Sequence, residues 1–206
     1  MKFPTEPIPS ASAFMREYQR VSDVARQSID ETSFEAACDL LADAYENDRM
    51  VFVCGNGGST AIANHMVCDH GKLIATGTRL KPRIVSLSHA NEMITAIAND
   101  IGYEEVFSHQ LDLLARRNDV LVTISGSGTS PNILRALEKA AEIGMRTLAM
   151  TAFSGGPSRK TANVSLHVDV ANYGIAEDIH QALMQMIAQY IRLQHIDPQD
   201  IPTAKF

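Results

Sequence analysis

Residues 50–69 read MVFVCGNGGSTAIANHMVCD, and this stretch decides the fold. Its apolar run, residues 50–54, is typical of a strand in a parallel sheet that is covered on both faces. The glycines of the GNGGS turn, residues 55–59, allow the positive φ angles and the close backbone approach that a phosphate cradle requires. We expect Ser59 to be the N-cap of an amphipathic helix, where free N–H groups and the helix dipole favour an anion. The stretch therefore predicts a strand, a phosphate-binding turn and a helix.

The turn does not match two phosphate-binding motifs that are easily confused with it. It lacks the G-K-[ST] ending of a P-loop, and Thr60 stands where a dinucleotide G-x-G-x-x-G has its third glycine. On the following helix, His65 and Asp69 stand four residues apart and share one face. Two interpretations of this pair stay open: metal ligands or proton carriers near the phosphate, or a hydrogen-bonded pair on the helix surface.

Composition narrows the class of protein. The chain has 206 residues, of which 45% are hydrophobic and 20% charged, and this suits one globular α/β domain. Its formal net charge of −6, without a basic run, argues against a nucleic-acid partner. No apolar run approaches the roughly 18 residues of a membrane span, and no signal peptide is evident. We expect a cytoplasmic protein away from membranes, with Cys38, Cys54 and Cys68 as reduced, buried thiols.

Two helices are expected ahead of the first strand. The first ten residues contain three prolines and predict an extended arm. Apolar residues at helical spacing over 12–29, and a capping box at 32–35 that opens a helix to about Ala44, predict a helical hairpin. Residues 1–47 would then stand outside the sheet. Because the hairpin has no sheet to cover, its apolar stripe is expected to pack on another subunit.

The rest of the chain alternates strands and helices. Further strands are expected at 83–87, 119–124, 147–151 and 164–168, with helices at 91–98, 104–115, 131–143 and 175–195. This alternation implies right-handed crossovers and a five-stranded parallel sheet with helices on both faces. The predicted fold class is a three-layer α/β/α sandwich of flavodoxin-like type.

A second loop of interest follows the third of these strands. Residues 125–131 read SGSGTSP, with four hydroxyl side chains and no charge. Pro131 suits the first position of a helix, and Ser130 its N-cap. A capped turn would explain this pattern, but so many hydroxyls are also what a neutral phosphate nest would use. Both loops directly follow strands, so we expect them to meet at the carboxyl edge of the sheet as one site.

The paired loops, with Asn99-Asp100 between them, resemble the sugar isomerase (SIS) domain family and, more narrowly, the phosphoheptose isomerases. The resemblance runs from the N-terminal helices to the last helix, so the whole chain, 1–206, is expected to be a single SIS domain. It implies a homotetramer that binds a phosphorylated sugar in the two loops and zinc in the active site. The implied substrate-binding residues are Asn56, Gly57, Ser59, Asp100, Ser125, Gly126, Ser127 and Ser130. Gly126 replaces a threonine that is usual in the family, so one hydroxyl is lost there.

The implied catalytic and metal positions depart further from the family. His65 matches its first metal-ligand histidine, whereas Asp69 replaces a glutamate that binds metal and acts as base. On the last helix, His180 falls at a glutamine ligand, Glu177 at an aspartate and Ala188 at a second catalytic histidine. We expect His65, Asp69 and His180 to form a three-ligand zinc site with an open position. The candidate catalytic residues are Asp69, His180 and Glu177.

The resemblance implies interconversion of sedoheptulose 7-phosphate and D-glycero-D-manno-heptose 7-phosphate. This aldose–ketose isomerisation passes through an enediol and requires a base and a group that polarises the carbonyl. Two alternatives stay open. One is a non-catalytic phosphosugar-binding protein acting as a tetrameric regulator or scaffold, which the loss of a histidine at Ala188 favours. The other is an isomerase of another ketose phosphate.

Overall fold

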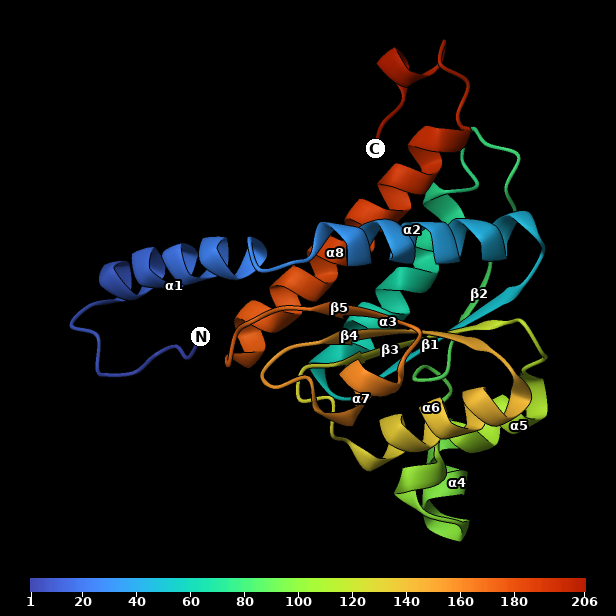
Figure 1. The fold of residues 1–206 in the computed structure, drawn as a ribbon, viewed down its shortest axis with the longest axis horizontal. Coiled ribbons are helices and arrows are strands. Elements are labelled where there is room, and N and C mark those ends of the chain that lie inside the picture. Colours follow the sequence, from blue (N-terminus) through green and yellow to red (C-terminus); the bar gives the residue numbers. More distant parts are fainter.

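A five-stranded parallel sheet forms the centre of the protein (Figure 1). The structure is a computed structural model that describes all 206 residues. The strands are β1 (Met50–Gly55), β2 (Arg83–Ser86), β3 (Val120–Ser125), β4 (Arg146–Thr151) and β5 (Val164–His167), in the order β2-β1-β3-β4-β5. Every neighbouring pair is parallel. The predicted sandwich is confirmed.

The strand order brings the two glycine-rich loops together. The chain passes from β1 outward to β2 and then returns to place β3 on the other side of β1. The crossovers from β1 and β3 therefore leave in opposite directions, and a crevice opens where these strands end. Gly55, the last residue of β1, is in register with Ile124 of β3, so the loops that follow begin side by side.

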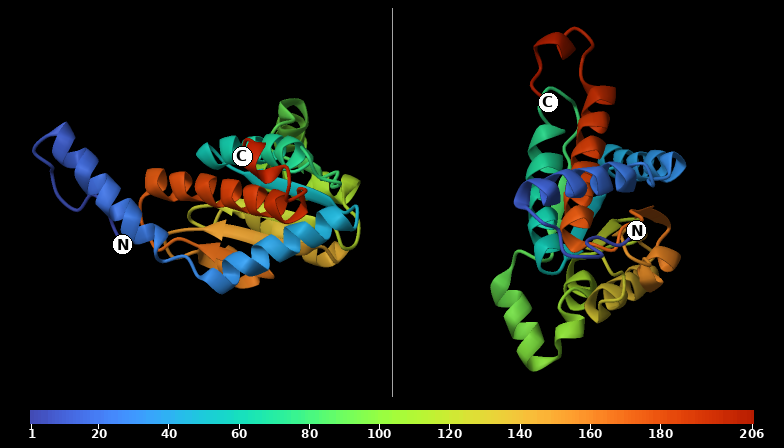
Figure 2. Two further views of the ribbon diagram at one scale, coloured as in Figure 1. Left: turned by 90° about the horizontal axis from the view of Figure 1, so that it is seen from above. Right: turned by 90° about the vertical axis from the view of Figure 1, so that its left-hand side faces the viewer.

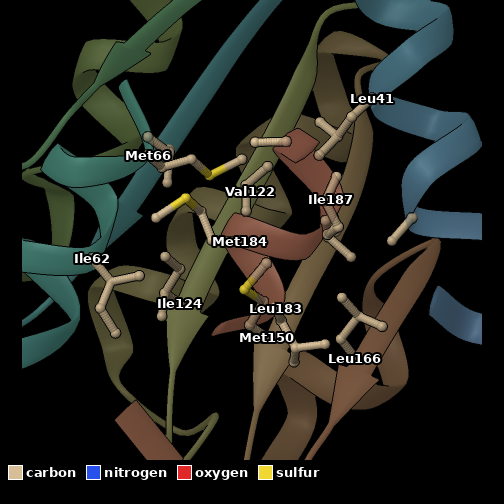
Figure 3. Close-up of a cluster of buried hydrophobic side chains, with 14 of the residues drawn as sticks. Leu41, Ile62, Met66, Val122, Ile124, Met150, Leu166, Leu183, Met184 and Ile187 are labelled. Carbon is tan, nitrogen blue, oxygen red and sulfur yellow. The ribbon is translucent and has the colours of Figure 1, made fainter. Parts of the chain in front are cut away.

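Helices cover both faces of the sheet (Figure 1). One face carries α2 (Glu31–Glu46), α3 (Gly58–Cys68) and α8 (Tyr173–His195), and the opposite side carries α4 (Asn91–Asp100), α5 (Ser108–Leu114), α6 (Pro131–Ile143) and α7 (Gly156–Thr161). Successive side chains of β3 point to opposite faces of the sheet, so this strand contributes to the hydrophobic core on each face. Val122 and Ile124 face α8, where they pack with Met66 and Leu183 (Figure 3), whereas Leu121 belongs to the cluster on the other face.

The N-terminal helices are present, but one of them is not free of the sheet. The helices α1 (Ala11–Arg26) and α2 lie roughly end to end, so they do not form the expected hairpin, and α1 extends beyond the body of the molecule (Figure 2). The expectation that their apolar faces are covered only by another subunit is wrong for α2, because it packs on β5 and α8. It is also wrong in part for α1, which packs on α8 and buries Val21 and Ala25. The extended arm is tied down by a bridge between Lys2 and Ala171 and by the buried ring of Phe3.

Three local features differ from the expected elements. The helix that begins at Gly58 passes into a π-helical turn, Asp69–Leu73, which the sequence did not signal. The short helix α7 lies between the fourth and fifth strands, where no helix was expected. Cys68 is exposed, so the expectation of a buried thiol is wrong there, whereas Cys38 and Cys54 are buried. None of the helices combines the length and the apolarity that crossing a bilayer demands.

Candidate active site

A cavity of about 280 Å³ lies at the carboxyl edge of the sheet, between the two glycine-rich loops. The first loop and the start of α3 form one wall, the end of β3 and its loop form a second, and the start of α8 forms a third. The lining residues are Asn56, Gly57, Gly58, Ser59, Ile124, Ser125, Gly126, Ser127, Ser130, Tyr173 and Glu177. All the predicted substrate-binding residues except Asp100 therefore line this one cavity. A larger cavity, about 700 Å³, lies between α2 and α8 and shares no residue with either loop.

Two glycines of the first loop, Gly55 and Gly57, are required by the backbone of the turn. A Cβ on Gly55 would lie 2.8 Å from the backbone of Ser59, so the turn closes only with glycine there. Gly57 adopts a positive φ of 55° and is the N-cap of α3. The expectation that Ser59 is the N-cap is therefore wrong, and this buried serine lies within the first turn of the helix. The N-terminus of α3 borders the cavity, where its dipole favours an anion.

The second loop presents hydroxyl groups at the N-terminus of α6. Ser130 is the N-cap, as expected, but its side chain makes no capping hydrogen bond and is free to bind a ligand. The loop is tied down elsewhere, because Ser125 Oγ accepts from the Gly128 amide at 3.2 Å and Ser158 Oγ donates to the Gly128 carbonyl at 2.9 Å. The cradle of hydroxyls therefore stands on a fixed backbone.

Asn56 is held at the cavity by a clamp that the sequence did not reveal. Its amide exchanges two hydrogen bonds with the amide of Asn132, at 2.8 and 2.9 Å, and its Oδ1 also accepts from Tyr103 Oη at 3.2 Å. The clamp joins β1, α6 and the segment after α4. Asp100 lies outside the cavity lining and accepts a hydrogen bond from Asn99 at 2.7 Å.

Glu177 is the only carboxylate that lines the cavity. It stands one turn into α8, and its side chain packs against the first turn of α3. The Glu177 carboxylate lies against Gly58, so that a Cβ at this position would require the carboxylate to move. The carboxylate therefore lies at the N-terminus of α3, next to the predicted phosphate loops.

A second group of polar side chains lies further along the contact between α3 and α8. His65 Nε2 lies 3.1 Å from Asp69 Oδ2, and His65 Nδ1 lies 2.9 Å from Gln181 Nε2. Gln185 donates a hydrogen bond to the same oxygen of Asp69. A carboxylate accepts, so His65 Nε2 carries a hydrogen toward Asp69, and the Gln181 amide donates to Nδ1. Sequence reasoning missed Gln185, although its spacing of four residues from Gln181, and of eight from Glu177, was a usable signal.

The structure does not bring His180 to this pair, and its predicted catalytic and metal-binding roles are corrected here. Its imidazole is fully buried and faces the sheet, where Nε2 donates to the Thr151 carbonyl at 3.2 Å. Burial lowers the pKa of His180 to about 4, so the ring is neutral. Ala188 is also buried in the core.

The donor set does not fit the predicted zinc site. Catalytic zinc in proteins takes three ligands from histidine, cysteine, aspartate and glutamate. Nowhere in the 206 residues do three such side chains come together as a metal site. His65 and Asp69 instead hydrogen-bond each other and two neutral amides.

Comparisons with known proteins agree with this architecture. The family model described as SIS domain matches residues 13–152. The phosphoheptose isomerase of Helicobacter pylori (strain P12) is 36% identical over 155 residues, which are 74% of this chain and 79% of that protein. The probable phosphoheptose isomerase of Thermoplasma volcanium is 34% identical over 177 residues, covering 86% of this chain and 90% of its own.

A solved structure supports the same grouping. The phosphoheptose isomerase of Neisseria gonorrhoeae superimposes with a TM-score of 0.79 at 30% identity, over 87% of this chain and 95% of its own. Sequence and structure thus agree over most of the chain. The protein therefore belongs to the SIS domain family and, within it, to the phosphoheptose isomerases.

Proposed function

We propose that this protein interconverts sedoheptulose 7-phosphate and D-glycero-D-manno-heptose 7-phosphate in heptose biosynthesis. The observation that carries this proposal is a single cavity in which two hydroxyl-lined loops face one carboxylate, Glu177. Such a cavity can hold the phosphate at one end and leave a base beside the carbon chain. The named relatives are phosphoheptose isomerases, and this selects the heptose among phosphorylated sugars.

The phosphate is bound without lysine. Ser127 and Ser130 donate hydroxyl hydrogen bonds, and Ser59 and Ser125 complete the cradle beside the N-termini of α3 and α6. Charge-assisted hydrogen bonds to a phosphate are stronger than neutral ones, and helix N-termini favour the dianion further. Binding of the phosphate fixes the position of the sugar in the cavity and leaves its reacting end free.

The isomerisation moves one proton between two carbons. In the direction from ketose to aldose, Glu177 takes the proton from C1, and the carbonyl oxygen on C2 gains a proton as the enediol forms. The same carboxyl group then returns its proton to C2, while the hydroxyl on C1 loses its proton and becomes the aldehyde. His65 and Asp69 lie outside the lining of this cavity, further along the contact between α3 and α8, and we infer that they are the second group that exchanges protons with the oxygens of the sugar.

A turnover assay tests the reaction and the role of Glu177 together. Purified protein is incubated with ketose phosphates of five to seven carbons, and aldose formation is followed. We expect the seven-carbon substrate to be converted, and Glu177→Gln to lower kcat by at least about 100-fold because it removes the base. Glu142→Gln, which changes an exposed carboxylate on α6, serves as the matched control. Full activity of Glu177→Gln would exclude Glu177 as the base.

A second candidate function is a non-catalytic phosphosugar-binding regulator. The observation in its favour is that His180 and Ala188 both lie in the core, so this cavity lacks a histidine from α8. Binding of the sugar phosphate by calorimetry, without any turnover, would favour this function over the isomerase.

We also propose that the protein is a cytoplasmic homotetramer. Three unpaired cysteines suit a reducing compartment. Large apolar side chains remain exposed on α1 and on the outer side of α8, and they favour contact between copies of the chain. These residues are Phe14, Met15, Val24, Met186, Tyr190 and Leu193.

A further inference from the structure

One wall of the cavity is aromatic. Tyr173 is the first residue of α8 and lines the cavity with 60% of its surface exposed. Its ring packs on Phe153, with 4.6 Å between the centroids and 50° between the planes. The side chain of Asn172 caps the helix by accepting from the Ile175 amide at 2.9 Å, which fixes the backbone from which the ring extends. A large exposed ring is thus held in place beside the phosphate loops.

The support beneath this ring is strained. Phe153 has a φ of +53°, in the left-handed region that bulky residues rarely adopt. Its amide donates to the Val170 carbonyl at 2.9 Å, and this bond holds the unusual conformation. Strained backbone of this kind persists where the surrounding structure fixes it, often at binding sites. Here the strained backbone of Phe153 places its ring behind the ring of Tyr173.

Gly126 belongs to the same arrangement. A Cβ at this position would lie 3.5 Å from both rings, in van der Waals contact. Gly126 therefore lies directly against the pair of rings formed by Phe153 and Tyr173.

The position of Tyr173 on α8 places its ring beside Glu177, the proposed base. Tyr173 and Glu177 are four residues apart and lie on one face of α8, so both border the same cavity. Ser127 and Ser130 line the same cavity, so a sugar whose phosphate they hold shares that space with the Tyr173 ring and the Glu177 carboxylate. The C–H groups of an extended carbon chain are the part of such a ligand that an aromatic face attracts.

We propose that Tyr173, supported by Phe153 and seated over Gly126, is the residue that selects the length of the sugar chain. This inference rests on the proposed binding of a phosphorylated sugar in the cavity. A longer carbon chain covers more of the ring, so the ring favours a seven-carbon substrate over shorter ones. Phosphate itself contacts the serines and not the ring.

The test compares Tyr173→Ala and Tyr173→Phe with the native protein. For the seven-carbon ketose phosphate we expect Tyr173→Ala to raise KM by about 5- to 10-fold, with kcat changed by less than about twofold. The increase should shrink as the chain shortens to five carbons. Tyr173→Phe retains the ring and should retain KM. Inhibition by inorganic phosphate should be unchanged in both variants. Leu113→Ala, an equally exposed apolar residue on α5 outside the cavity, is the matched control.

Two results would overturn the proposal. One is an unchanged KM for every sugar in Tyr173→Ala. The other is an equal loss for all chain lengths and for inorganic phosphate, which would mean that the substitution only disturbs the loops. If the native protein turns over none of the sugars, the isomerase proposal fails, and the same comparison is then made with dissociation constants from calorimetry.

Discussion

Asp69 is held by two side chains at the contact between the α3 segment and α8. Its carboxylate accepts from Gln185 and lies 3.1 Å from His65 Nε2, and only 17% of the side chain is exposed. These contacts hold the carboxylate and the imidazole in one relative orientation. Replacing Asp69 itself would change the chemical group and its position together, so substitution of its neighbour is more informative.

We predict that Gln185→Ala lowers kcat about tenfold by releasing Asp69, because a hydrogen bond to a charged group in a partly buried setting is lost. Steady-state kinetics show whether the substitution changes kcat, KM or both. Gln189→Ala, one turn further along α8, removes an amide for which the structure shows no side-chain hydrogen bond and is the control. Equal kinetics for the two variants would remove Asp69 and Gln185 from the mechanism.

The phosphate cradle gives a prediction about affinity. Ser127→Ala and Ser130→Ala should each weaken binding of the sugar phosphate by about 1–3 kcal/mol, because each hydroxyl makes a charge-assisted hydrogen bond. Isothermal titration calorimetry measures the change. Ser154→Ala, on an exposed loop outside the cavity lining, should bind normally. If affinity is unchanged in both cradle variants, the phosphate is bound elsewhere.

At the scale of elements, α8 shows where residue-by-residue inference fails. Its buried residues include Ile175, Ile179 and Leu183, and His180 lies among them. Neighbouring residues on a helix point about 100° apart, so a shift of one position separates a core residue from a site residue. The polar stripe that faces α3 is Glu177, Gln181 and Gln185, and its spacing of four residues was readable in the sequence. Which of the helix faces meets α3 was not readable, because that depends on packing.

Two histidines buried in the neutral form give α3 and α8 a pH-dependent stability. His70 lies in the π-helical turn, where Nδ1 accepts from Tyr45 Oη at 2.7 Å and Nε2 donates to the Met184 carbonyl at 3.2 Å. Burial lowers the pKa of His70 to about 4, as it does for His180. In the unfolded chain both take up protons near pH 6.5. The unfolded state therefore binds more protons between pH 6.5 and 4, and stability falls as the pH falls through this range.

We predict that each histidine lowers the free energy of unfolding by about 2 kcal/mol between pH 7 and pH 5. Urea denaturation at the two pH values, followed by circular dichroism, measures the difference. His70→Gln should remove its own part of the pH dependence, whatever it does to the stability at pH 7. An unfolding free energy that is equal at both pH values would contradict the neutral, buried state of the two rings.

At the scale of the whole molecule, the sheet and the meeting of the two loops were predictable for a simple reason. The carboxyl ends of parallel strands share one edge, and the return of the chain from β2 to β3 opens a crevice there. The clamp of Asn56, Asn132 and Tyr103 was not predictable, because it joins three segments far apart in the chain. The packing of α2 on the sheet was missed for the same reason.

The exposed helix α1 leads to the last prediction, which concerns assembly. It extends beyond the body of the molecule and exposes Phe14, Met15 and Val24, of which Met15 is 54% exposed (Figure 2). Apolar surface of this kind is stabilised by contact with another copy, so light scattering at micromolar concentration should give the mass of a tetramer. Met15→Glu would introduce a buried charge into that contact and should give smaller species with an unchanged circular dichroism spectrum. Leu113→Glu, on α5, changes a residue that is 61% exposed and distant from α1 in the chain, and it should leave the mass unchanged. A native protein that is monomeric at this concentration would refute the assembly.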